Sequence, residues 1–168
     1  STARINMNLR EDKHWSYGAF TGMPDARGPR PYYAQAAVQT DKTAESMVEL
    51  RKELTEAVGK RPLTEAEVEQ ARKSIVLSLP GSAETTPEVA GFFVNTLTFG
   101  LPDSYYNDLV ARVNGLTTAQ ANAALKRLVH PEALTWLVVG DLAKIEAKVR
   151  KLNFGEVKVL DADGNEVK

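Results

Sequence analysis

The sequence predicts an α+β domain in which helices pack on one face of a mixed, largely antiparallel sheet. Two segments near the start, Trp15–Thr21 and Tyr32–Gln39, are rich in aromatic and β-forming residues and are separated by a Pro- and Gly-rich connection. The long middle of the chain carries helical patterns, and an apolar run returns near the end at Leu134–Val139. Strands and helices are thus largely segregated along the chain, which is typical of the α+β class.

The chain opens on a helical pattern, because Ile5 and Leu9 fall on one face of the segment from residue 1 to 10. A helix at the very start suggests a piece cut from something longer. The other end reads as a natural one, since turn residues at Asp161–Asn165 precede a short polar tail. With 168 residues, the chain is long enough for one ordinary domain.

The middle of the chain is expected to hold helices with recognisable ends. A stripe of Met47, Leu50, Leu54 and Val58 predicts a helix over about 43–58. Capping boxes at Thr64/Glu67 and Thr117/Gln120, a cap at Thr86 and a cap at Asp103 predict the starts of four more.

The last third alternates between strand and helix. Leu134–Val139 is expected to be a central strand covered on at least one face. A helix over about 142–152 should follow Asp141, and Val157–Leu160 should form the final strand.

Composition excludes several function classes. The 21 Lys and Arg balance 22 Asp and Glu to a formal charge of −1, which leaves no electrostatic footprint for nucleic acid or an anionic membrane. No apolar run is long enough for a transmembrane helix. The absence of Cys excludes disulfides and thiol catalysis.

Familiar catalytic motifs are also absent. The two histidines, His14 and His130, do not form an H-E-x-x-H or H-x-x-E-H pair, and no phosphate-binding glycine loop occurs. His14 with Glu11 or Asp12 can be imagined as a small site, although a solvated charged turn is the simpler interpretation. His130 reads as a helix cap, and Ser82 as a linker residue. The apolar set Phe92, Phe93, Leu97 and Phe99 is expected in the core, and Tyr105 and Tyr106 as packing residues.

Arg10 and Tyr17 are the strongest candidates for a binding site. Arg10 ends the first helix and carries a guanidinium with a fixed fork of donors, and Tyr17 places a phenolic donor on the next strand. Together they can hold peptide carbonyls or a developing oxyanion. The structural alternative pairs Arg10 with Glu11 or Asp12 and packs Tyr17 in the sheet. Spacing alone favours that alternative.

The run Arg4–Gly18 resembles the C-terminal, non-catalytic half of insulinase/pitrilysin-type zinc metalloproteases, the inverzincins. Relatives show an L-R-E-x-x-G-x-x-Y-G-like stretch, which Leu9–Gly18 matches except that His14 stands where they often carry Gly. Further similar stretches follow in the family's order, at residues 43–46, 62–67, 101–106 and 136–141.

The resemblance implies that Arg10 and Tyr17 bind substrate and that zinc sits in an N-terminal catalytic half or a partner subunit carrying H-x-x-E-H. Tyr17 would donate to the scissile carbonyl, a role worth roughly 3 kcal/mol, while Arg10 anchors a neighbouring carbonyl. Peptides would be the substrates, and this chain would hold no cofactor. The resemblance also implies that residues 1–168 form a single C-terminal domain that lacks its first strands and helix. The uncovered strands would be completed by another chain or a homo-oligomer. The alternative is a non-proteolytic scaffold subunit related to processing-peptidase proteins. The resemblance favours the periplasm, with the cytoplasm as the alternative.

Overall fold

The computed structural model of the protein describes residues 3–167 and confirms the α+β class. Two strands form an antiparallel sheet, β1–β2, and the other described elements are helices. The chain divides into two compact units. The first unit holds the residues up to Thr21, Ala34–Glu53 and the residues from Ala133 on, and the second holds Gly22–Tyr33 and Leu54–Glu132. That residues 1–168 act as one domain stays a prediction.

The first unit begins with a short α-helix that passes into a π-helix. Helix α1 spans Arg4–Asn6 and the π-helix η1 spans Met7–Asp12, where Lys13 N donates to the Asn8 carbonyl at 3.1 Å. The sequence predicts the helix and its buried face, since Ile5 and Leu9 are 5% and 1% exposed. It does not predict the π geometry, and Ser1 and Thr2 lie outside the described residues.

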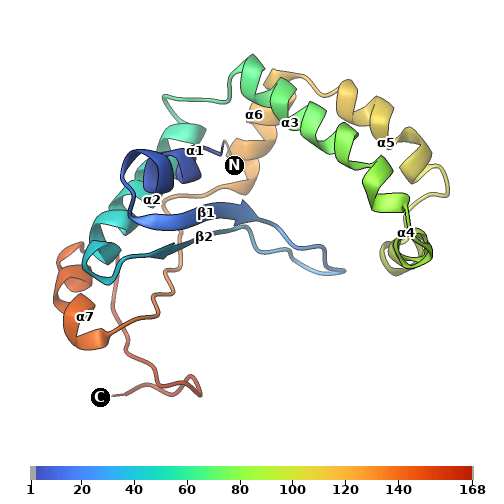
Figure 1. Ribbon diagram of the computed structural model, residues 1–168. Coiled ribbons are helices and arrows are strands. Elements are labelled where there is room, and N and C mark those ends of the chain that lie inside the picture. Colours follow the sequence, from blue (N-terminus) through green and yellow to red (C-terminus); the bar gives the residue numbers. More distant parts are fainter. Residues whose placement is uncertain (1–2, 168) are drawn as a thin grey trace. The chain divides into compact units, whose positions relative to one another are not determined.

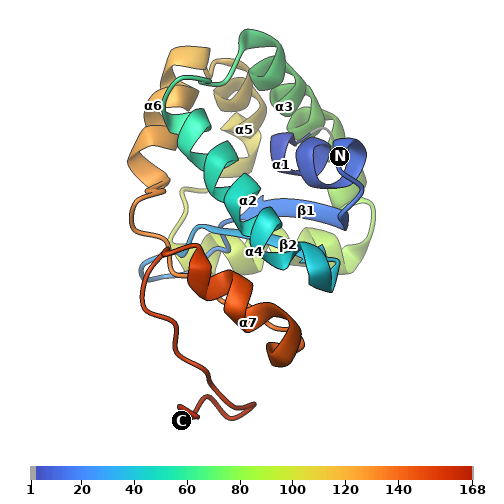
Figure 2. The ribbon, with the colours of Figure 1, turned by 90° about the vertical axis from the view of Figure 1, so that its left-hand side faces the viewer.

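The sheet of the first unit packs small side chains against this helix. Strand β1 spans Ser16–Gly22 and β2 spans Tyr33–Val38, as the sequence predicts to within a residue. Ala19 is buried in a cluster with Ile5, Leu9 and Leu50, and Ala34 and Ala36 pack against it. Small residues on the strands let the helices approach closely, so α1 and the helix α2 (Thr43–Val58) cover the same side of the sheet (Figures 1 and 2).

The first unit also contains most of α2 and all of α7. Helix α2 spans Thr43–Val58, as predicted, after a 3₁₀ turn η2 at Thr40–Lys42. Helix α7 spans Leu142–Lys151 and packs near η2, where Lys148 Nζ donates to the Asp41 carbonyl at 3.1 Å.

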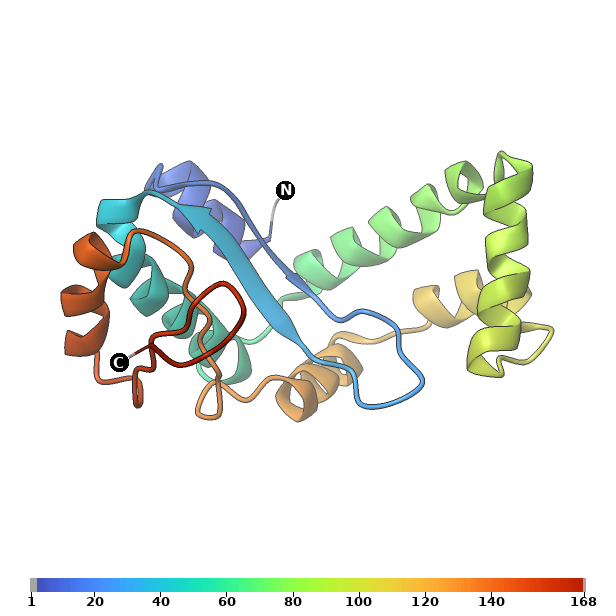
Figure 3. The same cartoon turned by 90° about the horizontal axis from the view of Figure 1, so that it is seen from below.

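The second unit is helical and its ends are largely set by side-chain caps. Its elements are α3 (Glu65–Ser78), η3 (Pro80–Ala83), α4 (Thr86–Phe99), α5 (Tyr105–Asn114) and α6 (Thr118–Leu128). Figure 3 shows α3 and α5 both meeting α4, which lies across their ends. Capping boxes start α3 at Thr64 and α6 at Thr117, as predicted.

Two predicted caps are wrong by small shifts. Helix α4 is capped by Thr85, whose hydroxyl accepts from Glu88 N, and Thr86 is already inside the helix. Thr85, and not Thr86, has Glu88 three residues ahead of it, which is the spacing that a capping box requires. Asp103 does not cap α5, because Ser104 is its N-cap residue and makes no side-chain cap bond.

The two predicted late strands do not form within the described residues. Leu134–Val139 belongs to no sheet, and Val157–Leu160 contributes only an isolated bridge from Leu160 to Glu166. A strand needs a hydrogen-bonded neighbour, and residues 3–167 supply none to Leu134–Val139.

The aromatic residues of the second unit behave in two ways. Phe93 and Leu97 are 68% and 80% exposed, so the prediction that this set lies in a core is wrong for both. Phe92 contacts Tyr106 with ring centroids 4.5 Å apart, and Tyr105 meets Tyr106 at 5.2 Å, as expected of packing residues.

Across the described part of the chain, no helix is long and apolar enough to cross a membrane.

Candidate functional site

Arg10 lies in the π-helix η1 with half of its side chain exposed to solvent. Its Nε is 3.6 Å from Glu11 Oε1, and the Glu11 side chain is itself 47% exposed. Such an exposed ion pair contributes little to stability, about 0–1 kcal/mol, and leaves the guanidinium able to bind another group. The structural alternative for Arg10 is therefore present but weak.

Tyr17 lies on β1 and is 96% exposed, which contradicts the alternative that it packs in the sheet. Among the described residues, nothing accepts or donates a hydrogen bond at its phenol, and none joins it to Arg10. A tyrosine normally buries its ring. A ring left in water on a strand next to buried Ala19 is available for a binding role.

Two asparagines that the sequence did not single out hold η1 and β1 in place. Asn6 is 2% exposed, and its Oδ1 accepts from the backbone N of Ala19 at 3.2 Å. Asn8 Nδ2 donates to Glu49 Oε2 at 2.8 Å and to Glu53 Oε1 at 2.9 Å on α2. The available signal was the presence of Asn inside a helical pattern, where its side chain usually bonds elsewhere.

His14 forms the turn between Arg10 and Tyr17 in a left-handed conformation, with φ of 56°. Its Nδ1 lies 3.0 Å from the Arg10 carbonyl, so the tautomer with a proton on Nδ1 donates to the end of η1. Gln39 Nε2 donates to the His14 carbonyl at 3.1 Å, and Trp15 N donates to the Leu9 carbonyl at 2.9 Å. Positive φ explains why glycine suits this position, and the ring contact shows how histidine is accommodated.

The other candidate residues from the sequence, around His14, His130 and Ser82, do not come together as a catalytic or metal site in the described residues. Within residues 3–167, no three His, Cys, Asp or Glu side chains converge as metal ligands, which counts against a site built on Glu11, Asp12 and His14. His130 lies at the end of α6, with Nε2 3.1 Å from the Arg127 carbonyl, as a helix cap should. Ser82 lies in η3 and donates to the Leu79 carbonyl at 2.7 Å, consistent with a linker residue.

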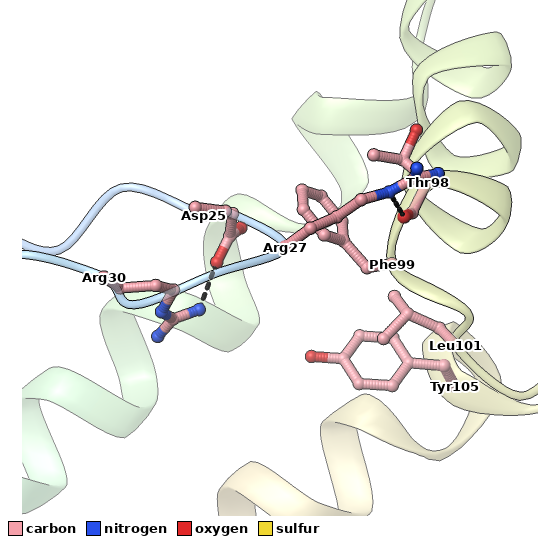
Figure 4. Close-up of a pocket in the computed structure, with 8 residues that line it drawn as sticks. Asp25, Arg27, Arg30, Thr98, Phe99, Leu101 and Tyr105 are labelled. Atoms are coloured by element: carbon pink, nitrogen blue, oxygen red, sulfur yellow. Dashed lines mark hydrogen bonds and ion pairs between the residues drawn. The ribbon is translucent and has the colours of Figure 1, made fainter.

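The second unit contains an open pocket of about 510 Å³, between the loop that carries Asp25 and Arg27 and the end of α4 (Figure 4). Arg27 Nε donates to the Thr98 carbonyl at 2.6 Å, which places a cation at the C-terminus of α4. Arg30 pairs with Asp25 within the loop. Both arginines are therefore engaged in contacts within the protein. Phe99, Leu101 and Tyr105 also line the pocket.

A comparison with protein families finds a match in the N-terminal region. The family described as "Peptidase M16 inactive domain" matches residues 1–75, which include both Arg10 and Tyr17. Residues 1–75, called the M16 segment below, are thus similar to the M16 inactive-domain family. The M16 segment takes in α1, β1, β2 and α2, so the resemblance to the non-catalytic half of an insulinase-family protein is supported.

A solved structure extends the likeness beyond the M16 segment. The crystal structure of a peptidase M16 inactive domain from Pseudomonas fluorescens is similar over 76% of this chain, with a TM-score of 0.69 and 19% identity. At that identity the likeness shows the fold alone. The chain spans only 30% of the length of that solved chain. No curated protein matches.

Proposed function

We propose that this chain is the substrate-binding, zinc-free half of a metallopeptidase, which cleaves peptides when paired with a half that carries H-x-x-E-H. The observation that carries the proposal is Tyr17, exposed over 96% of its surface on a strand within the M16 segment. Arg10, on the preceding π-helix, provides a second exposed donor.

In this proposal the two side chains have different tasks. The Tyr17 hydroxyl donates to the scissile carbonyl as it gains negative charge, and the zinc of the partner half activates the attacking water. Arg10 holds a neighbouring backbone carbonyl of the peptide with its planar fork of donors. Asn6, Asn8 and His14 keep η1 and β1 fixed, so that little ordering of the protein is needed when the peptide binds.

The test is peptide cleavage by the two-half enzyme with single substitutions in this chain. Tyr17→Phe removes one oxyanion donor and should lower kcat by about 10²–10³-fold. Arg10→Ala should mainly raise KM, by about 10-fold or more, since it removes a charged hydrogen bond to the substrate backbone. Tyr105→Phe is the matched control, because that ring packs on Tyr106 in the second unit and should leave turnover unchanged.

Unchanged turnover in both site variants, with the fold intact, would reject the site and favour the scaffold function. The proposed compartment is the periplasm, by resemblance to exported relatives. Finding the protein only in the cytoplasmic fraction of the source cells would reject that part.

A further inference from the structure

Ser16 directly precedes Tyr17 on β1, and its hydroxyl bonds to the backbone of both strands of the sheet. The Ser16 Oγ donates to the Ala37 carbonyl on β2 at 2.7 Å and to the Gly18 carbonyl on its own strand at 2.8 Å. The single hydroxyl proton is shared between these two carbonyls. The same oxygen accepts from the Gly18 backbone N at 3.1 Å. One side chain thus joins the backbone just beyond Tyr17 to the neighbouring strand.

The side chains of β1 change from exposed to buried at this point. Tyr17 is 96% exposed, whereas Ala19 is 2% exposed, although residues two apart on a regular strand share a face. Ala19 is held by packing in the Ile5 and Leu9 cluster, and its backbone N donates to Asn6 Oδ1 at 3.2 Å. Tyr17 has no comparable packing around its ring, so its direction depends on how the backbone beside it is held.

From these contacts we propose that Ser16 is a positioning residue for Tyr17, whose hydroxyl fixes the strand backbone that aims the phenol at the substrate. Ser16 Oγ holds Gly18 on one side of Tyr17 and links it to Ala37 on β2. The role assigned to Ser16 rests on the proposed function, because it exists only if the Tyr17 hydroxyl acts on the peptide.

The aim of the phenol matters because a donor stabilises a developing oxyanion only at hydrogen-bonding distance from it. The tyrosine oxygen lies at the far end of a long side chain, so a small rotation of the strand moves it further than it moves the backbone. A misplacement of about 1 Å can lower a rate by about 100-fold. Loss of the Ser16 hydroxyl is therefore expected to act on the chemical step more than on binding.

A purely structural role for Ser16 is the alternative. In that case the hydroxyl satisfies backbone groups of Gly18 and Ala37, and its removal lowers stability without a specific effect on turnover. The two roles differ in their effect on kcat and in whether that effect depends on the Tyr17 hydroxyl.

A matched pair of substitutions at Ser16 tests the proposal in the two-half enzyme. Threonine and valine have the same shape and differ in the hydroxyl. Ser16→Val should lower kcat by about 10-fold or more relative to Ser16→Thr, with KM changed by less than about two-fold. Ser16→Ala should give a similar loss relative to the unchanged enzyme, which keeps the test available if Ser16→Val does not fold. Equal kcat with and without the hydroxyl would overturn the proposal.

A double substitution shows whether Ser16 acts through Tyr17. In an enzyme that already carries Tyr17→Phe, Ser16→Val should cause no further loss of kcat relative to Ser16→Thr. A further loss of about 10-fold would overturn the positioning role. If Tyr17→Phe by itself leaves turnover unchanged, the proposed function fails and the role of Ser16 fails with it. If Tyr17→Phe lowers kcat while Ser16→Val behaves as Ser16→Thr, only the role of Ser16 fails.

Amide hydrogen exchange tests the contact in this chain alone. The Gly18 amide, which donates to Ser16 Oγ, should exchange at least about 10-fold faster in Ser16→Val than in Ser16→Thr. The Ala19 amide is the internal control, because it is bonded to Asn6 and should change little. Equal exchange of the Gly18 amide in the two variants would refute the contact on which the positioning role depends.

Discussion

Leu9→Ala offers the sharpest test of how the π-helix is held to the sheet. Leu9 is 1% exposed and is one of three large aliphatic residues in a cluster whose fourth member is Ala19. The substitution deletes three carbons, which corresponds to about 2.4 kcal/mol at about 0.8 kcal/mol for each buried carbon. The cavity left behind adds to this, giving an expected loss of about 3–4 kcal/mol in the free energy of unfolding.

Tryptophan fluorescence during urea unfolding measures this loss in the right part of the molecule. The chain has two tryptophans, and both Trp15 and Trp136 pack against the Leu9 cluster. With a denaturant slope of about 2 kcal/mol per molar, the midpoint should fall by about 1.5–2 M. Met7→Ala, in the same π-helix but at a residue 41% exposed, should move it by less than about 0.5 M. Equal shifts for the two variants would refute the assignment of Leu9 to a tightly packed core.

Three further predictions concern α4 and its ends. Thr85→Ala should destabilise the start of α4 by about 0.5–2 kcal/mol, whereas Thr86→Ala should have little effect; hydrogen exchange of the first-turn amides distinguishes the two. Gly91→Ala, with open space at its Cβ, should stabilise the helix by about 0.5–1 kcal/mol, while Gly100→Ala, at φ of 60°, should destabilise it by about 1 kcal/mol in thermal unfolding. The Thr85 hydroxyl and backbone N, which donate to the Glu88 carboxylate, hold the pKa of Glu88 below its ordinary value of 4.5. The cap is therefore at full strength above that value and is lost as the pH falls through the lowered pKa, and Glu88→Gln should reduce the acid-induced loss of helical circular dichroism.

The helices were largely predictable because their signals are local. The stripe on α2 and the boxes at Thr64 and Thr117 each lie within a few residues, so α2 was placed correctly and α3 and α6 to within a residue. The π-helix was not predictable from the Ile5 and Leu9 spacing, because that spacing also suits an α-helix. Leu134–Val139 failed as a strand for a different reason, since pairing depends on a neighbour that residues 3–167 do not provide.

The candidate site depended on resemblance more than on chemistry. Arg10 and Tyr17 are ordinary residue types, and their spacing alone favoured an ion pair and a packed ring. The structure removes half of that alternative, because Tyr17 lies in solvent. Asn6, Asn8 and His14 were missed as positioning residues, since their partners on β1, α2 and η1 become visible only in three dimensions.

The bare segment Leu134–Val139 also affects how the chain behaves when produced by itself. Six residues of high β-propensity without charge or proline match the pattern that seeds cross-β aggregation when it is exposed. Production of this chain by itself would therefore favour insoluble protein.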